Sequence, residues 1–139
     1  MRARIAGHPL HPALAHFPVG LWLASVLWDA IGWWRAGEPL WGQLSYWCVA
    51  LGLAAALPTA LTGFVELLAL GADEPAQATA AAHMMAMLAA TGLFGGSWLV
   101  RALDGGSAWA VPLALAGAAV LLVGGWLGGT LVYRHGIGR

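Results

Sequence analysis

Charged residues are scarce in this chain of 139 residues. Asp, Glu, Lys and Arg together make up 9% of it, whereas apolar residues make up 60%. A soluble domain usually carries about 25% charged residues. So few charges could not cover the surface of a water-soluble fold of this size. The composition therefore predicts a membrane protein.

Lysine is absent, and cysteine occurs once, as Cys48. Without lysine the chain cannot form a Schiff base or a P-loop. A single cysteine excludes an internal disulfide and any zinc or iron–sulfur site built on several thiolates. The net charge is zero, so no basic patch for nucleic acid is expected. The sequence also lacks the Cys-x-x-Cys-His motif that attaches haem covalently.

Four long apolar runs dominate the sequence, at residues 12–34, 41–70, 78–100 and 108–133. Each has the ~20 residues that a helix needs to cross the hydrocarbon core of a membrane. The runs do not alternate with period two, and short loops join them. We therefore predict an all-α integral membrane protein, an up-down four-helix bundle in one domain over residues 1–139. The first run is too long for a signal peptide, so we expect it to be retained.

The arginines predict the orientation of this bundle. Arg35 and Arg101 lie at one end, and the other four arginines lie with the two termini. Because positive charge favours the cytoplasmic side, both termini should be cytoplasmic. Tryptophans near the opposite end are typical of an interfacial belt. They are Trp33, Trp34, Trp41, Trp98 and Trp109.

Spaced glycines occur in the third and fourth runs, as Gly92/Gly96, Gly124/Gly128 and Gly125/Gly129. Such pairs allow close packing between helices, either within the chain or between copies in a homo-oligomer. They also suit a helix that leaves room for a flat group against it.

Histidine and one carboxylate recur near the membrane face that holds the termini. His16, His83 and Glu66 each lie about one helical turn inside a run, whereas His8, His11 and His135 lie just outside. Ionisable side chains within a membrane usually face the bundle interior and mark a functional site. One histidine at a helix end is more often an interfacial or capping residue, so His8 and His11 are weaker candidates than the pair His16 and His83. At the far end, Asp29 is expected to pair with Arg35 or Arg101.

Several short motifs make the chain resemble a known family. The sequence opens with His8-Pro9-Leu10-His11-Pro12 and Ala15-His16-Phe17-Pro18, continues through Thr62-Gly63-Phe64-Val65-Glu66 and His83, and ends with Gly125 to Gly136 around Tyr133-Arg134-His135. This pattern resembles the bacterial family of predicted membrane proteins called domain of unknown function 2231. The resemblance covers nearly the whole chain, with Glu66 where aspartate is more usual. It implies a location in the bacterial inner membrane. Fusions of some relatives to Rieske or cytochrome c modules imply electron transfer by association.

The first hypothesis for the histidines is a haem b with two axial ligands, which makes the protein a cytochrome b-like redox component. Helices one and three are diagonal in an up-down bundle, so His16 and His83 are expected to be the ligands. His11 or His135 is an alternative ligand or orients a propionate, and Arg134 binds the propionates. The electron partner would be a quinone or a redox protein.

Two other hypotheses remain open. A transition-metal site for zinc or copper would use the histidines with Glu66, and Met87 beside His83 would favour Cu(I). Its candidate ligands are His8, His11, His16, His83, His135 and Glu66. Alternatively, the protein is a non-catalytic membrane anchor for a partner redox domain, and the histidines are interfacial.

Reporter fusions test the predicted topology. A reporter inserted at Gly37 and one fused to the C-terminus should report opposite sides of the membrane, with the C-terminal reporter in the cytoplasm. The same compartment for both reporters would show that the predicted number of spans is wrong.

Overall fold

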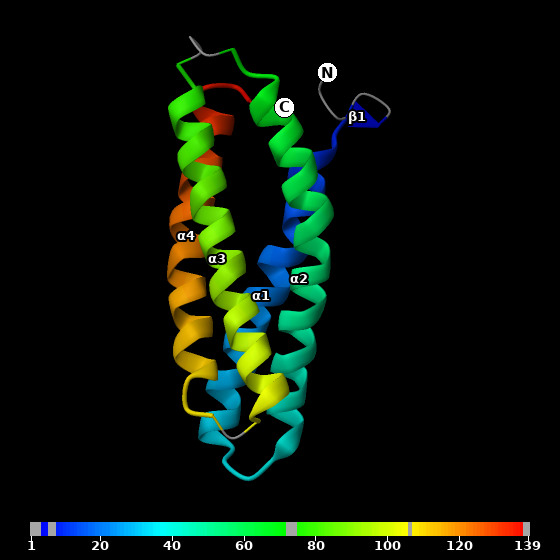
Figure 1. Ribbon diagram of the computed structural model, residues 1–139, viewed down its shortest axis with the longest axis vertical. Helices are drawn as coiled ribbons and strands as arrows, with labels where there is room; N and C mark the ends of the chain where they lie inside the picture. The colour runs from blue at the N-terminus through cyan, green and yellow to red at the C-terminus, as the bar shows by residue number, and fades with distance from the viewer. Residues whose placement is uncertain (1–3, 6–7, 72–74, 106, 138–139) are drawn as a thin grey trace.

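Four long helices make up the computed structural model, which describes residues 4–5, 8–71, 75–105 and 107–137. They are α1 (Leu10–Trp34), α2 (Pro39–Leu68), α3 (Gln77–Leu103) and α4 (Ala110–Tyr133), each within three residues of its predicted bounds (Figure 1). Two short strands, β1 (Arg4–Ile5) and β2 (His8–Pro9), pair antiparallel before α1. All four helices are long and apolar enough to cross a membrane. The prediction of an all-α four-helix membrane bundle is confirmed.

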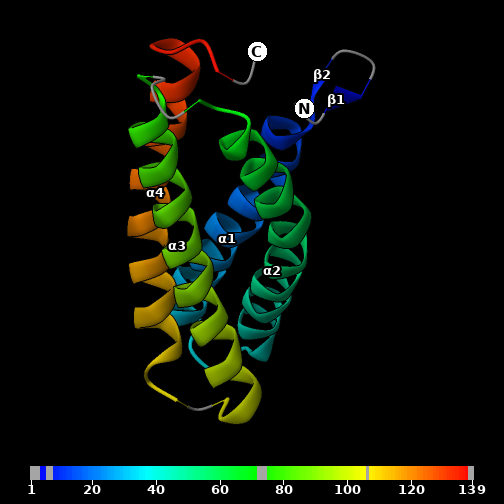
Figure 2. The ribbon, with the colours of Figure 1, turned by 45° about the horizontal axis from the view of Figure 1, so that its top comes forward.

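The helices are arranged as two hairpins. α1 packs mainly against α2, and α3 packs mainly against α4. The loop that joins the two helices of each hairpin lies at one end of the molecule, and both termini lie at the other end (Figure 1). Figures 1 and 2 show that the hairpins come closest toward the loop end and diverge toward the end with the termini. α1 and α3 therefore run in the same direction, and so do α2 and α4.

Each hairpin is held by a large ring that lies on a glycine of the partner helix. A methyl group on Gly52 of α2 would lie 2.5 Å from Nε1 of Trp22 in α1. A methyl group on Gly117 of α4 would lie 3.0 Å from the ring of Phe94 in α3. Only glycine allows the helices to approach this closely, because any other residue would displace the ring.

These contacts reveal an internal repeat. Asp29 of α1 and Arg101 of α3 are 72 residues apart, and the same interval separates Trp22 from Phe94. Buried positions follow the same interval: Pro18, Trp22 and Ser25 in α1 correspond to Ala90, Phe94 and Ser97 in α3. In the partner helices the interval is 65 residues, as from Gly52 to Gly117. The hairpins are thus parallel repeats related by an approximate two-fold axis along the bundle.

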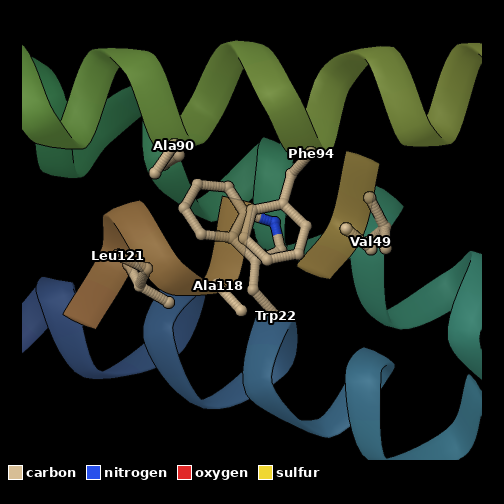
Figure 3. Packing of buried hydrophobic residues seen from close by; sticks show 8 residues of the cluster. Trp22, Val49, Ala90, Phe94, Ala118 and Leu121 are labelled. Atoms are coloured by element: carbon tan, nitrogen blue, oxygen red, sulfur yellow. The ribbon is translucent and has the colours of Figure 1, made fainter. Parts of the chain in front are cut away.

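The middle of the bundle is closed by a stacked aromatic pair on this axis. The rings of Trp22 and Phe94 are 4.7 Å apart between centroids and 10° from parallel, and neither residue is exposed (Figure 3). Such a pair contributes about 0.5–1.5 kcal/mol beyond the area that it buries. Val49, Ala90 and Leu121 surround it. The pair fixes the distance between the two hairpins.

A buried ion pair lies on the axis toward the loop end. The guanidinium of Arg101 donates hydrogen bonds of 2.9 and 2.6 Å to the two carboxylate oxygens of Asp29. The side chains are only 11% and 5% exposed. Arg35 instead pairs with Glu38 at the surface. Of the two partners expected for Asp29, the structure shows Arg101.

Replacing Asp29 with Asn should lower the stability of the bundle by about 3 kcal/mol, because it leaves the Arg101 charge buried without its counter-charge. Thermal unfolding in detergent measures the loss. Since the two positions are equivalent in the repeat, the exchanged variant Asp29→Arg with Arg101→Asp should recover most of the stability. An exchanged variant as unstable as Asp29→Asn would contradict the equivalence.

The exposed pair of Arg35 and Glu38 is the control for this experiment. Hydrogen bonds from Arg35 and then from Trp41 lower the pKa of the Glu38 carboxyl. The contribution of ionised Glu38 to folding stability is therefore present above the ordinary pKa of glutamate, and it is lost as the pH falls through the lowered pKa. Because solvent screens this pair, Glu38→Gln should have a much smaller effect than Asp29→Asn.

Candidate functional site

His11 lies at the start of α1 and is bonded to the backbone of α2. Its Nδ1 lies 2.9 Å from the carbonyl oxygen of Thr59. A methyl group on Gly63, one turn further along α2, would lie 2.8 Å from Cε1 of His11. The same oxygen lies 2.9 Å from Oγ1 of Thr62, which is equally close to the Pro58 carbonyl and can donate its one proton there instead. The Thr59 oxygen then has two lone pairs, one for the helix and one for His11. Glycine at residue 63 therefore makes the space in which the His11 ring reaches the α2 backbone.

His83 repeats this arrangement in the second hairpin. Its Nδ1 lies 2.8 Å from the carbonyl oxygen of Gly124 in α4. A methyl group on Gly128 would lie 3.1 Å from Cε1 of His83. His83 follows His11 by the same interval as Arg101 follows Asp29. The flat group that the glycines of α4 accommodate in this structure is thus an imidazole of the chain itself.

The two imidazoles meet across the axis. Their ring centroids are 6.2 Å apart, and the ring planes are 81° from parallel. A carbonyl oxygen can only accept a hydrogen bond, so Nδ1 carries a proton in both rings. In the neutral form of each ring, Nε2 then carries the free lone pair. The backbone thus fixes the tautomer that metal-binding histidines need.

A cavity of about 1390 Å³ surrounds the two histidines, and all four helices line it. Its walls are mainly apolar, with glycines from α4 and the methionines Met84 and Met87 from α3. Few ionisable side chains reach it. Those that line it are His11, His16, Glu66, His83, Tyr133 and Arg134.

The other residues predicted for the site have different positions. His16 lines the cavity from the exposed side of α1, where it has no hydrogen bond to another described residue. It follows His11 by five residues, which turns it about 140° around the helix. The structure therefore brings His83 next to His11, and the assignment of His16 as a ligand stays a prediction. His135 follows α4 and is half-buried, outside the cavity lining. The side chain of His8 lies outside the described residues.

The described residues do not form a site for a metal with many protein ligands. Among them, no three His, Cys, Asp or Glu side chains lie together in a way that could hold a metal ion. Zinc takes at least three protein ligands. A zinc site would have to include a side chain that the structure does not describe, such as His8. Two imidazoles instead suit a metal that needs one ligand on each side.

Sequence reasoning named Gly63 in a motif and Gly124 with Gly128 as a spaced pair, but it missed that these glycines and the carbonyls of Thr59 and Gly124 position the imidazoles. Comparing the chain with itself could have found them. A shift of 72 residues, the interval from Asp29 to Arg101, aligns identical residues of α1 and α3. These matches include His11 with His83, Gly20 with Gly92 and Ser25 with Ser97. A shift of 65 residues aligns Gly52 with Gly117 and Gly63 with Gly128.

The fold and the site define a class of protein: a four-helix membrane protein with an internal repeat and a pair of histidines in a cavity at one end. The model of the family "Predicted membrane protein (DUF2231)" matches residues 7–139. The chain belongs to this family, which confirms the resemblance seen in the sequence motifs. No curated protein and no solved structure matches it.

The Nδ1–H tautomer of both histidines can be measured by ¹⁵N NMR of protein labelled at histidine. The Gly63→Ala variant should displace the His11 ring and change its signals, while those of His83 keep the Nδ1–H pattern. Such overpacking costs about 1–3 kcal/mol of stability. Gly125→Ala is the matched control, because a methyl group there meets nothing within 4 Å. An Nε2–H pattern for either histidine in the unchanged protein would refute the hydrogen-bond assignment.

Proposed function

We propose that this protein binds one haem b between His11 and His83 and carries electrons in the membrane. One observation supports this most: two imidazoles face each other across the axis, each with Nδ1 bonded to a backbone carbonyl. Low-spin haem needs two axial ligands on opposite sides of the macrocycle. This proposal uses His11, the alternative ligand of the sequence analysis, in place of His16.

The separation of the rings agrees with axial ligation. Two metal–nitrogen bonds of about 2 Å each, with about 1 Å from each nitrogen to its ring centre, place two axial imidazoles about 6 Å apart. The observed separation of the centroids is 6.2 Å.

The cavity provides the surroundings that such a cofactor needs. Its apolar walls would exclude water from a macrocycle and help to set its potential. Arg134 lines the cavity at the end with the termini, where its guanidinium could bind a propionate in two-point fashion. Glu66 lines the same end and could exchange protons with the site.

The chemistry of the site favours electron transfer. A haem held by His11 and His83 would have no open position for oxygen or substrate, so it would serve to accept and release one electron. The electron partner would be a quinone of the membrane or a redox protein. With both termini in the cytoplasm of a bacterium, as the arginines predict, the site would lie near the cytoplasmic face of the inner membrane.

A copper(I) site is the second candidate, and Met87 favours it. Its Sδ lies against α4, where a methyl group on Gly124 would be 2.7 Å away. The Gly124 carbonyl is the one that holds His83, so the thioether lies close to this ring. Copper(I) accepts imidazole and thioether ligands. A site formed by His11, His83 and Met87 would leave the protein colourless.

An absorption spectrum with pyridine haemochrome analysis, together with copper and zinc analysis, tests this proposal. The purified protein should be red and contain one haem b. His11→Ala and His83→Ala should each abolish the low-spin spectrum, while His16→Ala and His135→Ala should retain it. A colourless protein with stoichiometric copper would support the second candidate. Absence of both cofactors after growth with excess haem and copper would refute both and favour a membrane anchor.

A further inference from the structure

The two halves of the repeat allow each side of the bundle to be compared with the other. The approximate two-fold axis relates the face between α1 and α4 to the face between α3 and α2. A residue that the fold itself requires should have a similar counterpart on the other face. Differences between equivalent residues therefore show where one face has a further role.

The two faces differ near the histidine pair. His16 on α1 corresponds to Leu88 on α3. Gly129 on α4 corresponds to Phe64 on α2, and Tyr133 on α4 corresponds to Leu68 on α2. In the other direction, Glu66 on α2 corresponds to Leu131 on α4. At the first three of these positions the face between α1 and α4 thus carries an imidazole, a glycine and a phenol, where the other face carries Leu88, Phe64 and Leu68.

The cavity follows this difference. It extends to the surface between α1 and α4, where Gly20, Gly129 and Tyr133 line it. Of the equivalent residues on the other face, Leu88 also lines the cavity, whereas Gly92, Phe64 and Leu68 are not part of its lining in the described chain. Gly20, Trp126 and Tyr133 are also exposed on helices that are long and apolar enough to span the membrane. Most of the exposed residues that line the cavity lie on α1 and α4, and Leu88 lies on α3. The cavity therefore opens sideways toward the lipid mainly through the face between α1 and α4.

We propose that this lateral opening between α1 and α4, lined by His16, Gly20, Gly129 and Tyr133, binds the ring of a quinone from the bilayer. This inference rests on the proposed redox function of the same cavity and identifies which partner it uses. A ligand that arrives through an opening toward lipid must itself be soluble in lipid. The polar groups at the opening, an imidazole and a phenol, can donate hydrogen bonds to ring carbonyls.

The shape and composition of the opening agree with a flat ring that carries an apolar tail. Gly20 and Gly129 leave flat surfaces. A methyl group added to Gly20 would meet nothing within 4 Å, and one added to Gly129 would meet only Tyr133 within that distance. Exposed Trp126 borders the opening and offers an aromatic face for stacking. A phospholipid tail would use the glycines but would gain nothing from His16 and Tyr133.

Equilibrium binding of decylubiquinone to the full chain in lipid nanodiscs tests this inference. We expect saturable binding that Gly20→Phe weakens at least tenfold, because the new ring fills the opening. Gly92→Phe is the matched control at the equivalent position, and it should change the Kd less than twofold. A methyl group meets nothing within 4 Å at either glycine, so the fold should tolerate both substitutions. His16→Leu, which installs the residue of the other face, should weaken binding without loss of haem.

The outcomes distinguish this inference from the haem proposal. Equal effects of Gly20→Phe and Gly92→Phe, or no saturable binding, would overturn the quinone site. Equal competition by decanol, which has a tail without the ring, would also overturn it and indicate a lipid tail as the occupant. The absorption spectrum of each sample reports haem separately. Binding of decylubiquinone by a haem-free protein, weakened by Gly20→Phe alone, would support the quinone site while the haem proposal failed.

Discussion

Close contact between a ring and a glycine is the interaction on which the rest of this structure depends. In lipid, apolar side chains gain little by leaving the bilayer, so helices associate through close packing and hydrogen bonds. Trp22 lies on Gly52 and Phe94 lies on Gly117 at the middle of the bundle, and the two histidines lie on Gly63 and Gly128 near one end. Each glycine brings the helices of one hairpin together. The rings that they accommodate then lie at the interface between the hairpins.

The result is a column of paired side chains on the approximate two-fold axis. The pair of histidines, the stacked aromatic pair and the buried ion pair follow one another from the end with the termini to the end with the loops. Asp29 and Arg101 are equivalent in the repeat, yet they carry opposite charges. Two like charges at this depth would repel each other, so the ion pair requires the halves to differ. The aromatic pair separates the ion pair from the histidines and leaves the cavity at one end.

The repeat also explains how one fold can carry both a symmetric and an asymmetric feature. The histidine pair needs symmetry, because each ring uses the same bond to a backbone carbonyl in its own hairpin. The cavity departs from symmetry, because most of its exposed lining residues lie on α1 and α4. The residues that differ there, such as His16 and Leu88, are not needed for packing, since the other half folds with the alternative residue. They are therefore the residues in which a role beyond the fold is expected.

The sequence by itself determined the helices, the family and the end of the bundle at which the histidines lie. Length and hydropathy suffice for the spans, because in lipid a helix must satisfy its own backbone hydrogen bonds. The sequence also placed Asp29 beside one of two arginines. It did not determine which histidine meets His83, because depth in the membrane follows from residue number, whereas direction depends on how the helices are rotated and packed. His16 and His11 differ by about 140° around α1. Only the tertiary structure shows that Gly63 and the Thr59 carbonyl hold His11 toward the axis, while His16 lines the cavity from the exposed side of α1.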